Sequence, residues 1–259
     1  MLNPIYHIRT AFKLIFELNR HSPVHKARLA HFNSHRAELQ KILNIPYHLG
    51  ELTPIDVIKY LDYSDGIVHY FLDGGDTVLT NYELGENCII FDVGAYKGEW
   101  TAGILKRCKN SFVHLFEPDP SSFSRLSETF ADNPLVILHP FGLSNKDTVA
   151  SMNFSGLGSS LHLGPACGNV ELRDIYRFIT DNRIGKIDLV KINIEGEEYA
   201  LLDRMIETEI IKRCGIVQVQ FHEWFPNSTF LRDGLRLRLA KTHRALWNYP
   251  FVWESWKLL

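Results

Sequence analysis

The chain has 259 residues, of which 45% are hydrophobic and 22% are charged, and its formal net charge is −2. This composition is typical of a soluble globular protein with one α/β domain and an extension, and the near-neutral charge argues against wholesale nucleic-acid binding. The longest apolar run near the start is interrupted by charged residues, and the four cysteines show no metal-ligand or disulfide spacing. We therefore expect no membrane span and no exported chain, but a cytoplasmic protein with reduced thiols.

The first 50 residues are basic, with seven Lys and Arg against two acids. Apolar residues recur at helical spacing between Ile5 and Ile15 and again between Leu29 and Leu43, which predicts two amphipathic helices. We interpret this segment as a helical cap on the main domain. The alternative is a basic surface for peripheral contact with an anionic lipid or acceptor.

Residues 55–85 have a different character from the basic segment. Short β-prone runs are separated by Asp65–Gly66 and Gly74–Gly75, and both dipeptides favour hairpin turns. We therefore predict that residues 1–85 form an N-terminal extension with helices and a β-hairpin.

From residue 86 to residue 259, strand and helix patterns alternate, as is typical of a mostly parallel sheet. The predicted strands are Cys88–Val93, Phe112–Phe116, Leu135–His139, Ile187–Ile192 and Ile216–Phe221, with a closing hairpin over residues 245–258. The predicted helices start near Glu99 and after Pro120, and later ones contain Leu172 with Ile175, Tyr176 and Ile179, then Leu201 with Met205, then Leu231 with Leu239. This order predicts one doubly wound α/β domain with a seven-stranded sheet.

A polar stretch from Ser144 to about Gly168 interrupts this alternation. Within it, Phe154–Leu161 is rich in glycine and serine, so this segment is a candidate for a mobile lid over a bound acceptor substrate. A simple surface hairpin is the alternative.

The strongest motif is FDVGAYKG at residues 91–98, where the first predicted strand ends. Gly94 and Gly98 allow a sharp turn and a close approach of a nucleotide-like ligand to the backbone. Their G-x-x-x-G spacing differs from the three-glycine dinucleotide fingerprint. Asp92 precedes the first glycine and can neutralise an ammonium group on a ligand with an amino-acid part. The alternative is a structural glycine turn without a ligand.

A carboxylate, Glu117, ends the second predicted strand, 25 residues after Asp92. Doubly wound folds bind ribose hydroxyls at this position, and a carboxylate can accept a hydrogen bond from both. The alternative is an acid that stabilises the start of the next helix, a role that Asp119 fits better.

Polar residues also end the next two central strands. Asn193 and Glu195 follow Ile192, and His222 follows Phe221. The ordinary pKa of histidine suits proton removal near neutral pH, so we predict that His222 is a general base and that Glu195 orients it or binds a neighbouring hydroxyl. The alternative is a core histidine that hydrogen-bonds a loop.

Together these motifs resemble the FkbM family of class I methyltransferases over about residues 86–224. The segments that carry the resemblance are Asp92–Ala95, Phe116–Pro118, Gly142–Ser144, Asp188–Lys191, Glu195–Gly196 and Gln220–His222. The resemblance implies a Rossmann-like fold, S-adenosylmethionine as cofactor, and O-methylation of a hydroxyl on a sugar, glycan or other natural product. Family members often accompany surface-polysaccharide biosynthesis.

The resemblance also implies site residues. It matches to a cofactor site Asp92, Gly94, Ala95, Tyr96, Gly98, Glu117, Gly142, Leu143 and Asn193. Glu117 corresponds to the ribose acid, and Gly142 and Leu143 to the adenine side. Tyr96 and Asn193 stand where the family often has Asn and Asp.

Other function classes share parts of this pattern. A nicotinamide-dependent oxidoreductase would share the sheet and Glu117, but the glycine spacing opposes it. A non-catalytic cofactor-binding protein would need a disabled acceptor site. Asn193, which stands where the family often has Asp, leaves this alternative open. The acceptor could also be a protein or a lipid rather than a small molecule or glycan. We predict no metal site, since His21, His25, His31 and His35 read as scattered surface residues. The oligomeric state does not follow from the sequence.

Overall fold

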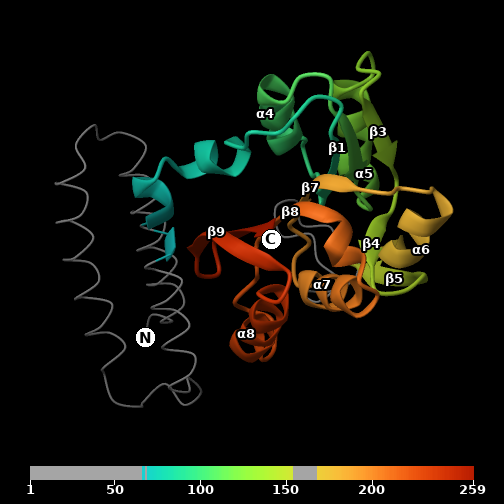
Figure 1. The fold of residues 1–259 in the computed structure, drawn as a ribbon. Coiled ribbons are helices and arrows are strands. Elements are labelled where there is room, and N and C mark those ends of the chain that lie inside the picture. Colours follow the sequence, from blue (N-terminus) through green and yellow to red (C-terminus); the bar gives the residue numbers. More distant parts are fainter. Residues whose placement is uncertain (1–65, 68, 154–167) are drawn as a thin grey trace, which may run out of the picture.

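The computed structural model describes residues 66–67, 69–153 and 168–259 (Figure 1). The two predicted amphipathic helices of the basic segment and the glycine- and serine-rich segment Phe154–Leu161 lie outside the described residues. In the described part of the chain, no helix combines the length and the apolar character that crossing a membrane would require.

The main sheet has seven strands within the described residues, in the order β3-β2-β1-β7-β8-β10-β9. The strands are β1 (Ile89–Val93), β2 (Phe112–Phe116), β3 (Val136–His139), β7 (Ile187–Ile192), β8 (Cys214–Val219), β9 (His243–Tyr249) and β10 (Trp253–Leu258). The first five of these pair in parallel, and β10 is antiparallel to both β8 and β9. The predicted mostly parallel sheet and its closing hairpin are therefore confirmed.

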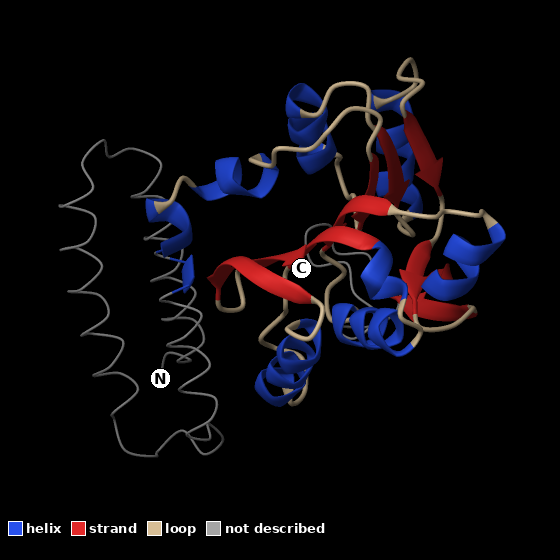
Figure 2. Cartoon of the chain, in the orientation of Figure 1, coloured by secondary structure: helices blue, strands red, loops and turns tan. Residues whose placement is uncertain are grey.

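Helices cover both faces of this sheet (Figure 2). They are α4 (Glu99–Arg107), α5 (Pro120–Thr129), α6 (Ile175–Asp181), α7 (Glu198–Glu207) and α8 (Ser228–Leu239). Successive residues of β1 point to opposite faces: Ile90 packs in one core with Ile104 and Leu126, whereas Phe91 packs in the other with Leu201. Because both faces are buried, the strands read as continuous apolar runs.

Two helices start at an aspartate that caps them. Asp119 accepts hydrogen bonds from the backbone N–H groups of Ser121 (2.8 Å) and Ser122 (3.3 Å), and Pro120 occupies the first turn of α5. Asp174 caps α6 in the same way. The prediction that Leu172 lies on this helix is wrong, because Leu172 precedes the cap and belongs to a strand.

A second sheet replaces the predicted polar interruption. Its strands β4 (Gly142–Ser144), β5 (Thr148–Met152) and β6 (Gly168–Asp174) are ordered β4-β6-β5. Val170 and Leu172 of β6 are buried with Met152 of β5, while the alternate residues of β6 face outward. This small sheet lies beside α6, at the side of the molecule away from β9 (Figure 1).

The described end of the N-terminal extension is helical. Residues 66–72, apart from residue 68, form a helix, and Gly75–Thr80 forms a 3-10 helix, η1. The predicted hairpin turn at Gly74–Gly75 is therefore wrong: Gly74 precedes η1, Gly75 begins it, and both have positive φ. The extension packs on the C-terminal hairpin, and the Tyr82 hydroxyl donates to Gln218 Oε1 at 3.0 Å.

Candidate active site

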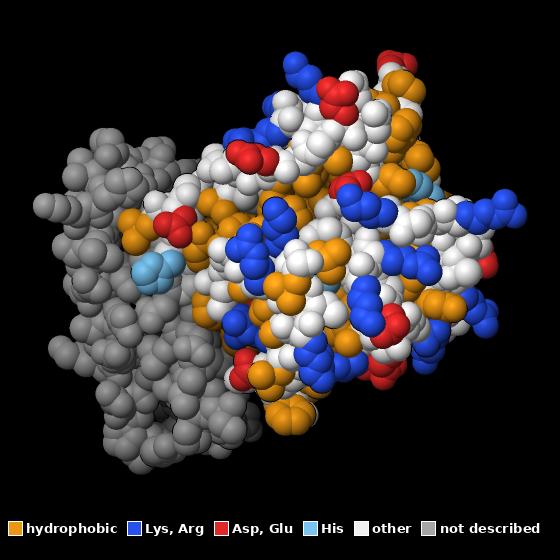
Figure 3. All heavy atoms as spheres, in the orientation of Figure 1, with side chains coloured by type: hydrophobic (Ala, Val, Ile, Leu, Met, Phe, Trp, Pro, Cys, Tyr) orange, Lys and Arg blue, Asp and Glu red, His pale blue; other side chains and the backbone are white. Residues whose placement is uncertain are grey.

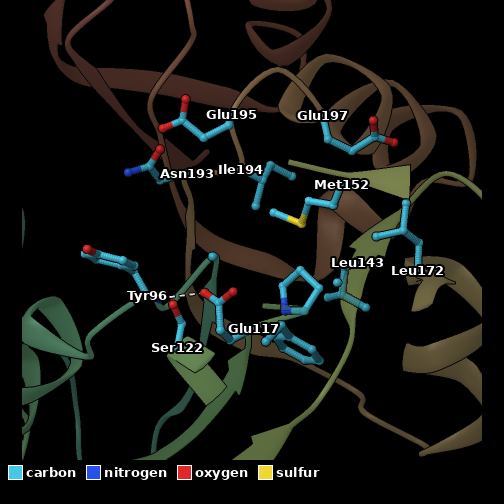
Figure 4. Close-up of a pocket in the computed structure, with 14 residues that line it drawn as sticks. Tyr96, Glu117, Ser122, Leu143, Met152, Leu172, Asn193, Ile194, Glu195 and Glu197 are labelled. Atoms are coloured by element: carbon cyan, nitrogen blue, oxygen red, sulfur yellow. Dashed lines mark hydrogen bonds between the residues drawn. The ribbon is translucent and has the colours of Figure 1, made fainter. Parts of the chain in front are cut away.

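A pocket of about 770 Å³, part of it open to solvent, lies at the carboxyl ends of β1, β2 and β7. The strand order changes direction between β1 and β7, and ligands of doubly wound sheets bind at such a point. Tyr96 and Leu172 lie on opposite sides of the pocket, with Glu117 between them (Figure 4). The lining residues are Gly94, Tyr96, Phe116, Glu117, Pro118, Ser122, Gly142, Leu143, Met152, Leu172, Asn193, Ile194, Glu195 and Glu197.

Gly94 lies where the backbone after β1 closely approaches the backbone after β7. Its φ is +82°, and a Cβ atom at this position would lie 1.9 Å from the carbonyl oxygen of Asn193. The Gly94 N–H donates to the Phe116 carbonyl at 3.0 Å, which fixes the turn after β1. Any side chain here would push β1 and β7 apart.

Two residues assigned to the cofactor loop do not line the pocket. Gly98 precedes α4 with a φ of +76°, and a Cβ atom there would lie 2.5 Å from the Phe130 ring, so this glycine serves packing against α5. Ala95 is buried in the same core as Ile104. Their environment is the protein interior, so their contact with the cofactor stays a prediction that the pocket lining does not support.

Asp92 is completely buried and also lies off the pocket wall. One of its carboxylate oxygens lies 2.8 Å from Lys191 Nζ, and the other accepts from the Thr101 hydroxyl at 2.6 Å. Lys191 donates in addition to the Gly94 carbonyl at 2.7 Å. In this structure Asp92 holds Lys191, and Lys191 holds the glycine turn. Contact between Asp92 and a ligand's ammonium group stays a prediction.

Glu117 lines the pocket with 6% of its surface exposed. Its two oxygens accept from the backbone N–H groups of Tyr96 (2.7 Å) and Asp119 (2.9 Å), and Figure 4 marks the first bond. Burial raises the pKa of the carboxyl group to about 7, although both backbone hydrogen bonds act in the opposite direction. The carboxylate thus keeps free lone pairs toward the pocket and sits at the edge of ionisation near neutral pH.

The small sheet supplies an apolar wall. Gly142, Leu143, Met152 and Leu172 line the pocket from β4, β5 and β6. A flat hydrophobic ring could pack on this wall. Above it, Glu197 accepts a hydrogen bond from the Ser144 hydroxyl.

At the end of β7, the Asn193 side chain offers an unsatisfied acceptor. Its backbone N–H donates to the Val93 carbonyl at 3.0 Å, but its buried Oδ1 has no hydrogen-bond partner among the described residues. A buried polar atom without a partner is costly, so it indicates a place for a ligand donor or a water.

His222 lies beside this end of the pocket, between two carboxylates. Its Nε2 is 3.2 Å from Glu195 Oε1 and its Nδ1 is 3.0 Å from Glu198 Oε1. Burial lowers the pKa of His222, but the hydrogen bonds and negative charges of both glutamates outweigh burial and raise the pKa to about 10. The premise that His222 has an ordinary pKa is corrected: the two neighbouring carboxylates raise the pKa and favour the protonated ring.

Several residues of this site have no counterpart among the residues predicted from the sequence. Glu198, Glu197, Met152 and Leu172 were not assigned, and neither was the role of Lys191. The run of acids Glu195, Glu197 and Glu198 after a buried strand was a usable signal for Glu197 and Glu198. The contribution of the small sheet carried no local signal. Within residues 66–67, 69–153 and 168–259, no group of three or more His, Cys, Asp or Glu is arranged to hold a metal ion.

In the sheet order, the antiparallel strand β10 lies between β8 and β9. This order and the pocket at the switch point are those of the Rossmann-like fold of class I methyltransferases. The sequence model of the methyltransferase FkbM domain matches residues 92–241, more than half of the chain. The chain therefore belongs to the FkbM methyltransferase family, as the sequence motifs predicted.

The individual relatives and solved structures described next share less than 30% sequence identity with this chain. The hexuronic acid methyltransferase AglP of Haloferax volcanii is 28% identical over 144 residues, which are 54% of this chain and 58% of that protein. Among solved structures, fibrillarin from Methanococcus jannaschii is 11% identical with a TM-score of 0.43, over 71% of this chain and 73% of that chain. The precorrin-6y C5,15-methyltransferase of Geobacter metallireducens is 10% identical with a TM-score of 0.41, over 71% and 86% of the two chains.

Proposed function

We propose that this methyltransferase uses S-adenosylmethionine to methylate a hydroxyl group of a sugar or glycan. The observation that carries the proposal is that two features share one pocket. Glu117 can accept hydrogen bonds from a diol, and Glu195, which contacts His222, lines another part of the same pocket. The family and the printed name of the Haloferax relative support the methyl transfer and the sugar class.

The pocket fits the chemical groups of this cofactor. The Glu117 carboxylate would accept from both ribose hydroxyls. The backbone exposed at Gly94 and the unsatisfied Oδ1 of Asn193 would take the amino-acid part, whose ammonium group needs acceptors. The wall with Leu143 and Met152 would cover the adenine ring. A nicotinamide dinucleotide would instead need a pyrophosphate cradle, which the G-x-x-x-G turn does not provide.

S-adenosylmethionine supplies a methyl group that is already activated, so the chain's own residues have to position the acceptor oxygen and manage its proton. Positioning alone can contribute several kcal/mol to lowering the barrier. A general base within hydrogen-bond reach contributes roughly 10²–10⁴-fold in rate. Glu195 lines the pocket and contacts His222, so this pair is the part of the site that can receive the hydroxyl proton.

The charge of the pocket favours a hydroxyl over a carboxylate as the methylated group. Glu195 and Glu197 both line it, and no Lys or Arg of the described residues does. A hydroxyl can donate a hydrogen bond to a carboxylate, whereas an acceptor carboxylate would be repelled by two of them. A sugar acid is compatible with this site if its own carboxylate points away from the two glutamates.

Two measurements test the proposal. Titration calorimetry should detect binding of S-adenosylmethionine and of its demethylated product, and no comparable binding of NAD. Transfer of a radiolabelled methyl group should then be measured with methyl glucoside and methyl glucuronoside, followed by mass spectrometry to separate ethers from esters. Binding of NAD without binding of S-adenosylmethionine would refute the cofactor. An ester as the main product would refute the hydroxyl acceptor.

A further inference from the structure

His222 belongs to a chain of three side chains rather than to a pair. Glu198, the first residue of α7, is fully buried. Its Oε1 accepts from both the backbone N–H (2.9 Å) and the ring Nδ1 (3.0 Å) of His222, and its Oε2 accepts from the Gly196 N–H at 2.8 Å. On the other side of the ring, Nε2 faces Glu195 Oε1 at 3.2 Å.

This geometry favours one arrangement of the protons. An ionised carboxylate can only accept hydrogen bonds, so a ring between two ionised carboxylates satisfies both only when both of its nitrogens carry a proton. Burial lowers the pKa of His222, but the two glutamates outweigh this and raise it to about 10. A doubly protonated ring has no lone pair with which to accept a proton from an acceptor.

The other groups around His222 do not change this balance. From α7, the Tyr199 hydroxyl donates to the His222 carbonyl at 2.9 Å, and burial raises the pKa of this phenol, which keeps it neutral. Arg232 of α8 is committed to the buried Glu254. On its own segment, His222 is followed by Glu223, another acid, and by Trp224, whose ring centroid lies 5.7 Å from that of His222.

Glu195, in contrast, is placed to reach an acceptor. It lines the pocket, its side chain is 22% exposed, and its backbone adopts a φ of +50° at the end of β7. Non-glycine residues avoid this conformation, and such residues cluster at functional sites. The ring nitrogen of His222 engages Oε1.

We propose that Glu198 is a positioning residue that holds His222 as an imidazolium cation, and that Glu195 is the group that takes the proton from the acceptor hydroxyl. This inference rests on the proposed function. As the acceptor oxygen forms its bond to the methyl carbon, the carbon–sulfur bond breaks and its electron pair stays on sulfur, which becomes a neutral thioether. The hydroxyl proton moves to the Glu195 carboxylate and from there to solvent. His222 keeps both of its protons throughout and orients Glu195 through its Nε2, which lies 3.2 Å from Glu195 Oε1.

The first test is a ¹⁵N NMR titration of the imidazole of His222 in the whole protein without ligand. The expected result is an imidazolium at pH 8, whose deprotonation moves to lower pH by at least one unit in Glu198→Gln. Glu207→Gln is the matched control, since Glu207 is an exposed acid on the same helix, and it should leave the titration unchanged. A neutral His222 ring at pH 7.5 in the wild-type protein would overturn the proposal, whether or not the Glu198 variant folds.

The second test is the pH dependence of kcat for methyl transfer to whichever methyl glycoside is accepted. We expect kcat to fall on the alkaline side, where His222 loses its proton, and this limb should move to lower pH by at least one unit in Glu198→Gln. If His222 were the base, the same variant would free the ring of its proton and raise kcat at pH 7. Calorimetry with S-adenosylmethionine distinguishes failure of the proposed function from failure of the inference about His222. If the wild-type protein does not bind the cofactor, the proposed function is refuted but the NMR result still stands.

Discussion

Lys191 Nζ lies 2.8 Å from Asp92 Oδ1, and the two side chains are 5% and 0% exposed. The residues face each other in the parallel ladder between β1 and β7, at the point where the strand order changes direction. Because Nζ also donates to the Gly94 carbonyl, the ion pair links the sheet to the turn that borders the pocket.

We predict that Lys191→Met destabilises the protein by about 3–5 kcal/mol, since it leaves the Asp92 charge buried without a partner. Chemical denaturation measures the change in the free energy of unfolding. Asp92→Asn combined with Lys191→Met should recover part of the loss. Lys186→Met is the control: Lys186 pairs with Asp188 at the surface, and losing that pair should cost less than about 1 kcal/mol. Equal losses for the two lysines would contradict the role given to the buried pair.

Gly94→Ala should impair both folding and cofactor binding. The new Cβ atom would meet the Asn193 carbonyl oxygen at 1.9 Å in a left-handed conformation, and such strain costs about 1–3 kcal/mol before the clash is added. Thermal unfolding and calorimetry measure the two effects. Gly185→Ala serves as the control, because its Cβ atom would have open space. A Gly94→Ala protein with wild-type melting and binding would show that the turn can move aside.

Glu117 should make cofactor affinity depend on pH. With its pKa raised to about 7, the carboxyl group is largely protonated at pH 6 and ionised at pH 8. The ionised form accepts from a diol, so affinity should rise with pH across this range and level off above it. Glu117→Ala should bind at least tenfold more weakly, equivalent to about 1.4 kcal/mol, and should lose the pH dependence. Calorimetry at several pH values is the measurement, and a wild-type affinity that stays flat with pH would contradict the prediction.

Glu195→Gly should separate stability from activity. Glycine relieves the left-handed backbone at φ +50°, so the free energy of unfolding should stay the same or rise by about 1 kcal/mol. Methyl transfer should fall by roughly 10²-fold or more, because the carboxylate is lost. Glu209→Gly is the matched control, with φ +61° and an exposed side chain that pairs with Lys212. It should gain similar stability without losing turnover.

The N-terminal boundary can be tested by truncation. A chain that begins at Leu52 should keep cofactor affinity, because every predicted cofactor residue lies beyond it. A chain that begins at Glu86 should be markedly less stable, since it loses Tyr82, whose hydroxyl bonds Gln218 and Ser255 at 3.0 Å each in the interior. Melting temperature and calorimetry compare the two, and equal stability would place the structural boundary at residue 86.

The strands of the main sheet were predictable because burial on both faces leaves an unbroken apolar run. Phe112–Phe116 and Ile187–Ile192 were predicted with their observed bounds. The small sheet was not, since Leu172 fits a helical spacing with Ile175 and Ile179 as well as the alternation of β6. Asp174 was the signal that could have separated the two, because it caps a helix that starts after it.

Site residues were predictable where position along a strand decides their place, as for Gly94, Glu117 and Glu195, which all line the pocket. Local sequence could not reveal which way a side chain at a strand end would turn. Asp92 points into the interior because Lys191, far away in sequence, offers a buried counter-charge. Glu195 and Glu198 together raise the pKa of His222 above its ordinary value. The contact with Glu198 depends on how α7 packs against the end of β8.

The two sides of the pocket come from sheets that, within the described residues, share no hydrogen-bonded ladder. Figure 3 shows that apolar, basic and acidic side chains are interspersed on one face of the described part of the molecule. Because the small sheet is separate from the main sheet, a smaller side chain at Met152 or Leu172 would enlarge the space beside the proposed adenine wall without disturbing the register of the main sheet. Such a variant would be a starting point for a cofactor analogue with a bulky substituent on the base, which natural methyltransferases in the same cell would reject. A transferable tag on that analogue would then mark the acceptors of this enzyme in a mixture.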